Sequence, residues 1–282
     1  MTRIAPALSL AVALLALPAG AQTAKAVAAP TPVPASLPAP ASVAAPVAEA
    51  PPPPSTPAEA ARAAGRRLDA FQAKEARALL EPVAGQAVSN ADVAVALGRL
   101  LEQEKKYEES AKVLAQAAVA APADPRPHLQ LGETLLRAKK AAEADAAFRK
   151  AADLAAKAAA ANPSDASAFL AQGTALSRLR RYDEAMTALE KGRALDGGTA
   201  ETLYQMGATR AFQQKWADAV PLLTQALGKD SGKALAYYFR GLAQEKLGRK
   251  DQMVLDLDRF VKLAPTAPEA ERARAVLAAA SR

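Results

Sequence analysis

The chain has 282 residues with 36 basic and 29 acidic side chains, which gives a formal net charge of +7, and it has one histidine and no cysteine. This inventory excludes disulfide bonds, zinc sites with the usual ligand sets, and catalysis by Cys/His or Ser/His/Asp constellations. The charge excess is small and diffuse, which suits solubility or acidic partners rather than nucleic-acid binding.

Residues 1–21 have the pattern of a secretory signal peptide. Arg3 precedes a short apolar run over residues 7–17, and the small residues Ala19, Gly20 and Ala21 follow it. This pattern predicts export with cleavage after Ala21. The apolar run is shorter than the roughly 20 residues of a membrane-spanning helix, and an uncleaved anchor is the alternative. We therefore expect a periplasmic or secreted protein.

Residues 22–57 contain 11 prolines among 36 residues and no aromatic residue. Such a composition cannot bury enough apolar surface to offset the ordering entropy, so it predicts a disordered linker with polyproline character. The linker is either a spacer that holds the following domain away from a membrane or wall, or a tail without a function.

A motif then recurs along the chain. Its copies begin at glycines 34, 41, 34 and 34 residues apart, namely Gly98, Gly132, Gly173, Gly207 and Gly241. Twelve positions after these glycines come Ser110, Ala144, Ala185, Ala219 and Met253, and sixteen positions after them come Leu114, Phe148, Leu189, Leu223 and Leu257. Apolar spacings of three and four residues predict two amphipathic helices per copy, which must stack on the next copy to bury both faces. Glycine inside a helix costs about 1 kcal/mol relative to alanine, so its recurrence predicts close approach of the paired helices.

The order of small residue, alanine, leucine or aromatic residue and terminal proline, at a period of 34, resembles the tetratricopeptide repeat family. The terminal prolines are Pro122, Pro163 and Pro265. The resemblance implies an all-α, right-handed superhelical solenoid of antiparallel helix pairs. The chain departs from the family at three positions: Arg210 and Gln244 replace a large apolar residue, and Met253 replaces alanine.

The period predicts six repeats and a cap. The repeats are 58–90, which is degenerate, 91–124, 125–165, 166–199, 200–233 and 234–265, and a capping helix follows over 266–282. The third repeat has seven extra residues between Phe148 and Pro163. Seven residues are close to two helical turns, so we expect its second helix to extend without rotating its buried face. The extension is either a ridge on the array or a neutral variation in length.

No residue pattern indicates catalysis. The single histidine, His128, occupies a position that holds apolar or aromatic residues in the other repeats, so we expect a structural imidazole. Acidic pairs at 108–109 and 183–184 begin second helices, where they match the helix dipole. No glycine-rich phosphate loop is present. We expect no enzymatic activity, no cofactor and no metal.

The resemblance implies that the first helix of each repeat lines a concave surface, through its fifth, ninth, twelfth and thirteenth positions. The candidate binding residues at these positions are Arg99, Glu133, Arg137, Leu170, Arg178, Tyr204, Phe212, Tyr238 and Lys246. Aromatic, apolar and guanidinium groups suit an extended peptide or helix that carries acidic groups. The alternative is that Arg137 and Arg178 form only a solvated face. The lysine and asparagine set with which some family members clamp a chaperone's terminal carboxylate is missing here.

We therefore expect a noncatalytic protein–protein interaction scaffold of the cell envelope, in the periplasm of a Gram-negative bacterium. One alternative is an envelope structural or assembly factor, tethered by an uncleaved N-terminal segment. Another is a binder of peptidoglycan or another glycan. The sequence does not identify the partner.

Overall fold

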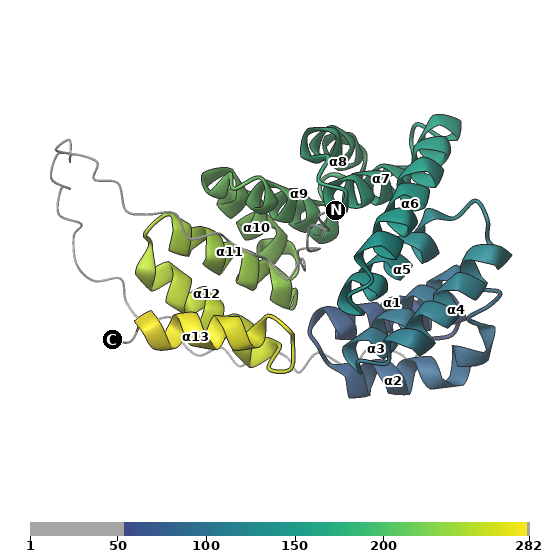
Figure 1. The fold of residues 1–282 in the computed structure, drawn as a ribbon, viewed down its shortest axis with the longest axis horizontal. Helices are drawn as coiled ribbons and strands as arrows, with labels where there is room; N and C mark the ends of the chain where they lie inside the picture. Colours follow the sequence, from purple (N-terminus) through teal and green to yellow (C-terminus); the bar gives the residue numbers. More distant parts are fainter. Residues whose placement is uncertain (1–53, 281–282) are drawn as a thin grey trace, which may run out of the picture. The chain divides into compact units, whose positions relative to one another are not determined.

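The computed structural model describes residues 54–280, which belong to one compact unit. Thirteen α-helices and one 3-10 helix make up its regular structure, and the described residues contain no strand (Figure 1). The all-α prediction is therefore confirmed. The expected signal peptide, and the expected linker up to residue 53, lie outside the described residues.

Twelve of the helices form six consecutive pairs, and α13 follows the last pair. Their bounds are α1 Pro57–Asp69, α2 Ala73–Leu80, η1 Glu81–Gln86, α3 Ala91–Gln103, α4 Tyr107–Ala120, α5 Pro125–Arg137, α6 Ala141–Ala161, α7 Ala166–Arg178, α8 Tyr182–Asp196, α9 Ala200–Phe212, α10 Trp216–Lys229, α11 Ala234–Lys246, α12 Lys250–Leu263 and α13 Ala270–Ala280. No helix among residues 54–280 has both the length and the apolar character needed to cross a membrane.

The first helix of a pair begins at a capping side chain in five of the six pairs. The capping residues are Thr56, Asn90, Asp124, Asp165 and Thr199, and each accepts a hydrogen bond from a backbone N–H of the first turn. Thr56 also forms a reciprocal capping box with Glu59, so α1 begins at Pro57, inside the range expected for the linker. The sixth pair differs, because Lys233 stands at the N-cap of α11 and makes no such hydrogen bond.

The turn inside each pair contains one residue in the left-handed region. These residues recur with the repeat period, at φ between 55° and 72°, and are Phe71, Lys105, Lys139, Arg180, Gln214 and Gly248. The left-handed conformation is unfavourable for a residue with a Cβ atom. Only the sixth turn uses glycine, so the other five carry a local strain.

Close packing explains the recurring glycines. A Cβ atom built on Gly98, Gly132, Gly173, Gly207 or Gly241 would lie 2.5 to 2.8 Å from the large side chain sixteen positions later. At Gly173 the backbone oxygen of Ala185, the small residue twelve positions later, also lies 2.9 Å from this Cβ position. The glycine thus makes room mainly for a leucine or phenylalanine of the second helix.

The seven extra residues of the third pair lengthen its second helix. Helix α6 has 21 residues, whereas α4, α10 and α12 have 14 each. Leu154, Ala155 and Ala159 in the added part are buried. The extension therefore continues the buried face of the helix, as two added turns should.

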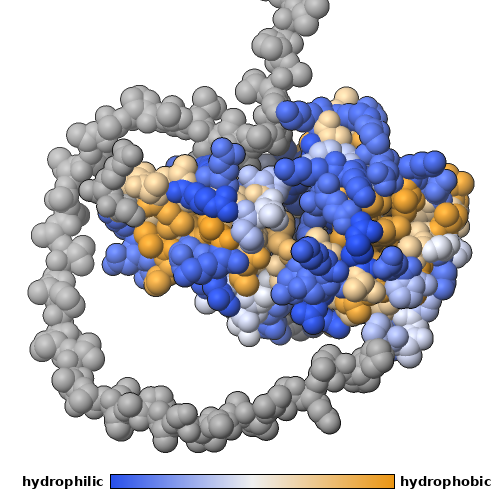
Figure 2. Space-filling model, turned by 90° about the horizontal axis from the view of Figure 1, so that it is seen from below, coloured by the Kyte–Doolittle hydropathy of each residue, from blue (hydrophilic) through white to orange (hydrophobic). Residues whose placement is uncertain are grey.

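The first and third pairs contact the last pair and the segment before α13. Phe71, in the turn after α1, packs against the hydrophobic cluster of α11, α12 and α13. Lys233 lies 3.0 Å from Asp69, and Arg137 lies 2.9 Å from Glu269. The face seen in Figure 2 has a broad hydrophilic band between two areas of hydrophobic surface. The two ion pairs, Lys233–Asp69 and Arg137–Glu269, join residues more than 130 positions apart in sequence.

Candidate binding cavity

A cavity of about 330 Å³ lies where the first and last repeats meet. The first helices of all six pairs contribute to its wall, through Leu68, Arg99, Glu133, Arg178, Tyr204, Leu235 and their neighbours. The turn after α1 and the segment between α12 and α13 complete it, through Phe71, Thr266 and Pro268. Side chains from the whole described unit therefore converge on one site.

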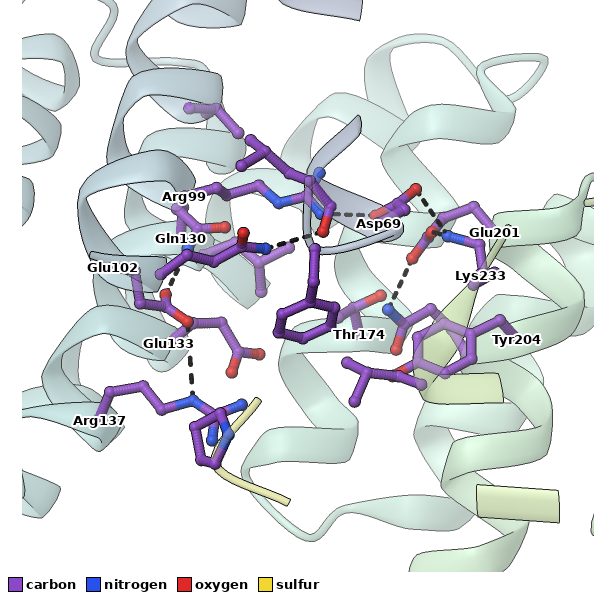
Figure 3. Close-up of a pocket in the computed structure, with 18 of the residues that line it drawn as sticks. Asp69, Arg99, Glu102, Gln130, Glu133, Arg137, Thr174, Glu201, Tyr204 and Lys233 are labelled. Atoms are coloured by element: carbon purple, nitrogen blue, oxygen red, sulfur yellow. Dashed lines mark hydrogen bonds and ion pairs between the residues drawn. The ribbon is translucent and has the colours of Figure 1, made fainter. Parts of the chain in front are cut away.

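One side of the cavity is held by a chain of ion pairs (Figure 3). Asp69 accepts a hydrogen bond of 2.5 Å from Arg99 and one of 3.0 Å from Lys233. Lys233 also donates to Glu201 at 2.7 Å, and its ammonium lies 5.4 Å from the centre of the Tyr204 ring. These groups come from α1, α3, α9 and the N-cap of α11, so the network joins distant parts of the chain.

A second network lies around Arg137. Its guanidinium lies 2.9 Å from Glu269 and 3.6 Å from Glu102, and Glu102 accepts a hydrogen bond of 2.8 Å from Gln130. Nearby, Arg178 donates to Glu133 at 2.5 Å. The carboxylates and guanidiniums of the cavity wall are thus paired with each other.

Burial sets the protonation of these groups. Removal from water raises the pKa of Glu102 to about 7, with Glu133 and Glu269 adding to the effect and Arg137 and Arg99 opposing it. Burial alone would lower the pKa of Lys233, but Glu201 and Asp69 raise it above its usual value. Near neutral pH, Glu102 is therefore the group of this wall whose charge changes, while Lys233 stays charged.

Five of the nine predicted binding residues line the cavity. They are Arg99, Glu133, Arg137, Arg178 and Tyr204. The three arginines among them have carboxylate partners within the chain, namely Asp69, Glu269 and Glu133. An acidic segment would have to displace a carboxylate of the chain itself.

The other four predicted residues do not line the cavity. Leu170 packs against the core cluster of Met186 and its neighbours, and Phe212 lies beneath the guanidinium of Arg178 at 5.5 Å. Tyr238 is only 2% exposed, because α13 and the segment before it cover the last repeat. Lys246 is exposed at the end of α11.

Several residues of the cavity wall were not among the predicted binding residues. Asp69 is the thirteenth residue of α1, so applying the family positions to the first repeat would have found it. Glu102 is the twelfth residue of α3, and it would have been found by including the twelfth position among the candidates. Lys233 was detectable as the residue that replaces a capping side chain. Glu269 lies between α12 and α13, outside the repeat pattern, and no sequence signal marks it.

Nothing in the described part of the chain indicates a metal site. Residues 54–280 hold no group of three histidine or acidic side chains placed to bind a metal ion. His128 is half-buried, and burial, with a contribution from Lys150, lowers its pKa. A neutral, partly buried imidazole agrees with a packing role.

Comparisons with known proteins identify the repeat. The tetratricopeptide repeat model matches residues 234–266, the sixth pair. No curated protein sequence shows significant similarity to the chain.

Solved structures match over a longer range. TTC0263, a thermophilic tetratricopeptide repeat protein of Thermus thermophilus, has 19% identity and a TM-score of 0.51, covering 66% of this chain and 96% of its own. The APC/C hetero-tetramer Cut9–Hcn1 has 14% identity and a TM-score of 0.56, covering 80% of this chain and 43% of its own. At these identities the likeness concerns the fold. Residues 234–266 thus match a tetratricopeptide repeat, and the described unit shares the fold of solved tetratricopeptide repeat structures.

Proposed function

We propose that the protein is a noncatalytic scaffold that holds a segment of another protein in the central cavity. The observation that supports this function best is the convergence of all six first helices on one cavity. Solenoids of helical repeats use their concave surface for binding, because it offers one wide surface built from equivalent positions. Fold alone does not identify a partner, so the cavity's chemistry must define what it accepts.

The cavity's size and lining define the segment. A volume of about 330 Å³ equals roughly 11 water molecules in the liquid at about 30 Å³ each, which is room for a few side chains. Val95, Leu129 and Leu235 offer apolar contacts, and Gln130 and Gln205 offer polar ones. Because the arginines of the wall and Lys233 are already paired with carboxylates, we infer that the cavity recognises a short internal segment by its shape and by neutral hydrogen bonds.

We also propose that the protein acts in the bacterial cell envelope. The support is the sequence pattern of residues 1–21 and the proline-rich composition of residues 22–57. The mass of the mature protein tests this location. A mature chain that begins at Gln22 in a periplasmic fraction supports export with cleavage, and a full-length chain in the membrane fraction supports the tethered assembly factor.

A pair of valine variants tests the cavity. Val95 lines it, whereas Val119 is 82% exposed on α4 and is absent from its wall. Val95→Trp fills the cavity, and Val119→Trp makes the same change outside it. We expect a crosslinked pull-down from the envelope fraction to lose its polypeptide partner with Val95→Trp and to keep it with Val119→Trp, when both variants have wild-type circular dichroism. Retention by both would contradict the proposal.

A further inference from the structure

We propose that the repeat unit switches between a closed form and an open form. In the closed form the Asp69–Lys233 and Arg137–Glu269 ion pairs join its N-terminal end, the first three pairs, to its C-terminal end, residues 233–280, and in the open form both ion pairs are broken. The open form admits the bound segment to the cavity. This inference rests on the proposed function, because it describes how access to the same cavity is controlled.

Few contacts join the two ends. Helices that are neighbours in sequence pack along their length, whereas the ends meet through two ion pairs and the ring of Phe71. Lys233 joins Asp69 to Glu201, and Arg137 joins Glu102 to Glu269. Because each repeat contacts mainly its neighbours, small rotations at several interfaces can separate the ends without unfolding any repeat.

Lys233 shows that the contact is a built feature of the fold. The five other first helices begin with a side chain that caps the helix, and α11 lacks this cap because Lys233 occupies its place. The Lys233 side chain is only 6% exposed and its ammonium is paired with two carboxylates. A local stabilising interaction is therefore replaced by an interaction between the ends of the unit.

The closed form is not a deep minimum. Buried ion pairs contribute little net stability, because the loss of hydration opposes their attraction. One oxygen of Glu269 and the side-chain oxygen of Gln103 are buried without a hydrogen-bond donor among the described residues. Opening restores water to these atoms and to Glu102. The two forms are therefore close enough in free energy for a bound segment to select the open one.

A double variant separates the two forms. Lys233→Asn removes the ammonium and supplies the capping side chain that the other repeats have, so the repeat itself is not weakened. Glu269→Gln removes the charge that faces Arg137. The matched control combines two substitutions. Lys215→Asn lies at the uncapped start of α10, and Glu271→Gln changes an exposed side chain of α13. The control makes the same chemical changes away from the cavity.

The distance between the ends is the measurement. The chain has no cysteine, so cysteines introduced at exposed Lys74 and Ala275 can carry spin labels for pulsed electron paramagnetic resonance. A second label pair, at exposed Lys112 and Arg149, reports on two neighbouring repeats.

We expect the double variant to shift the distance between the labels at 74 and 275 to longer values, while the distance between 112 and 149 stays unchanged. We expect 1 M NaCl to shift the wild type the same way, because salt stabilises the separated, solvent-exposed charges of the open form more than the buried ion pairs of the closed form. This arm does not depend on the folding of a variant. Unchanged 74–275 distances in both the double variant and high salt would overturn the switch, as would an equal shift in the control. This measurement uses the protein without a partner. A negative result would therefore overturn the switch alone, and the pull-down would still test the proposed function.

Discussion

At the scale of single residues, glycine has two opposite roles in the helices. A Cβ atom on Gly132 would lie 2.5 Å from the ring of Phe148, whereas one on Gly228, in α10, would meet nothing within 4 Å. Alanine is the better helix former by about 1 kcal/mol wherever there is room for its methyl group. The surroundings of each glycine therefore decide the sign of the substitution.

We predict that Gly132→Ala lowers the free energy of unfolding by about 2 kcal/mol, because overpacking displaces the phenylalanine. Gly228→Ala raises it by about 0.5 to 1 kcal/mol through helix propensity. Urea denaturation followed by circular dichroism measures both. Equal effects of the two substitutions would show that the glycines are not required for packing.

The left-handed turn residues give a second prediction. Gln214 has a φ of 60° and Gly248, one repeat later, has a φ of 72°. Gln214→Gly should stabilise the chain by about 0.5 to 1 kcal/mol and Gly248→Ala should destabilise it by about 1 kcal/mol, because only glycine adopts this conformation without steric cost. Thermal unfolding of the two variants checks the signs. A loss of stability for Gln214→Gly would contradict the claim that the left-handed backbone at Gln214 is strained.

At the scale of elements, α13 closes the open end of the solenoid. It buries Ala270 and Ala273, and the hydrophobic cluster that it joins contains Tyr238 and Phe260. Tyr238 was predicted as a binding residue because the family's fifth position faces the concave surface. The cap covers that position in the last repeat and buries the Tyr238 side chain.

We predict that ending the chain at Pro265 lowers the free energy of unfolding by at least about 2 kcal/mol, since it exposes the apolar side chains under α13. A chain shortened only by residues 281–282 is the control and should keep wild-type stability. Chemical denaturation of both chains provides the test. If the two unfold at the same denaturant concentration, α13 does not act as a cap.

The sequence predicted the helix pairs better than the cavity, for a physical reason. Recurring glycines and apolar spacings describe how each helix packs on its neighbour, and this packing repeats in every pair. The cavity depends on contacts between the ends, which occur once. Arg99, Glu133 and Arg178 could be found from their positions in the repeat. Their pairing, Arg99 with Asp69 and Arg178 with Glu133, depends on how the repeats are wound.

At the scale of the whole molecule, the protonation of Glu102 couples stability to pH. Its carboxyl has a pKa of about 7 in the folded chain, against 4.5 as the ordinary value. The folded chain therefore holds this proton more tightly than the unfolded chain does. The resulting stabilisation is fully present below pH 4.5 and is lost as the pH rises to about 7.

We predict that this loss amounts to at most about 3.4 kcal/mol, at 1.36 kcal/mol for each of the 2.5 units between 4.5 and 7. Glu102→Gln cannot ionise, so its stability relative to the wild type should increase between pH 5 and pH 8. Thermal unfolding of both proteins across this range measures the difference. A difference that does not change with pH would contradict the raised pKa of Glu102.

The central claim, that a protein segment binds inside the cavity, is tested most directly by photo-crosslinking from single sites. Gln205 lines the cavity, whereas Gln225 is exposed on α10 and is absent from the wall. A photoreactive amino acid replaces each glutamine in turn, and the protein is irradiated in its own cells. We predict a crosslinked polypeptide from position 205 and none from position 225. A crosslink from position 225 alone would place binding outside the cavity and contradict the account.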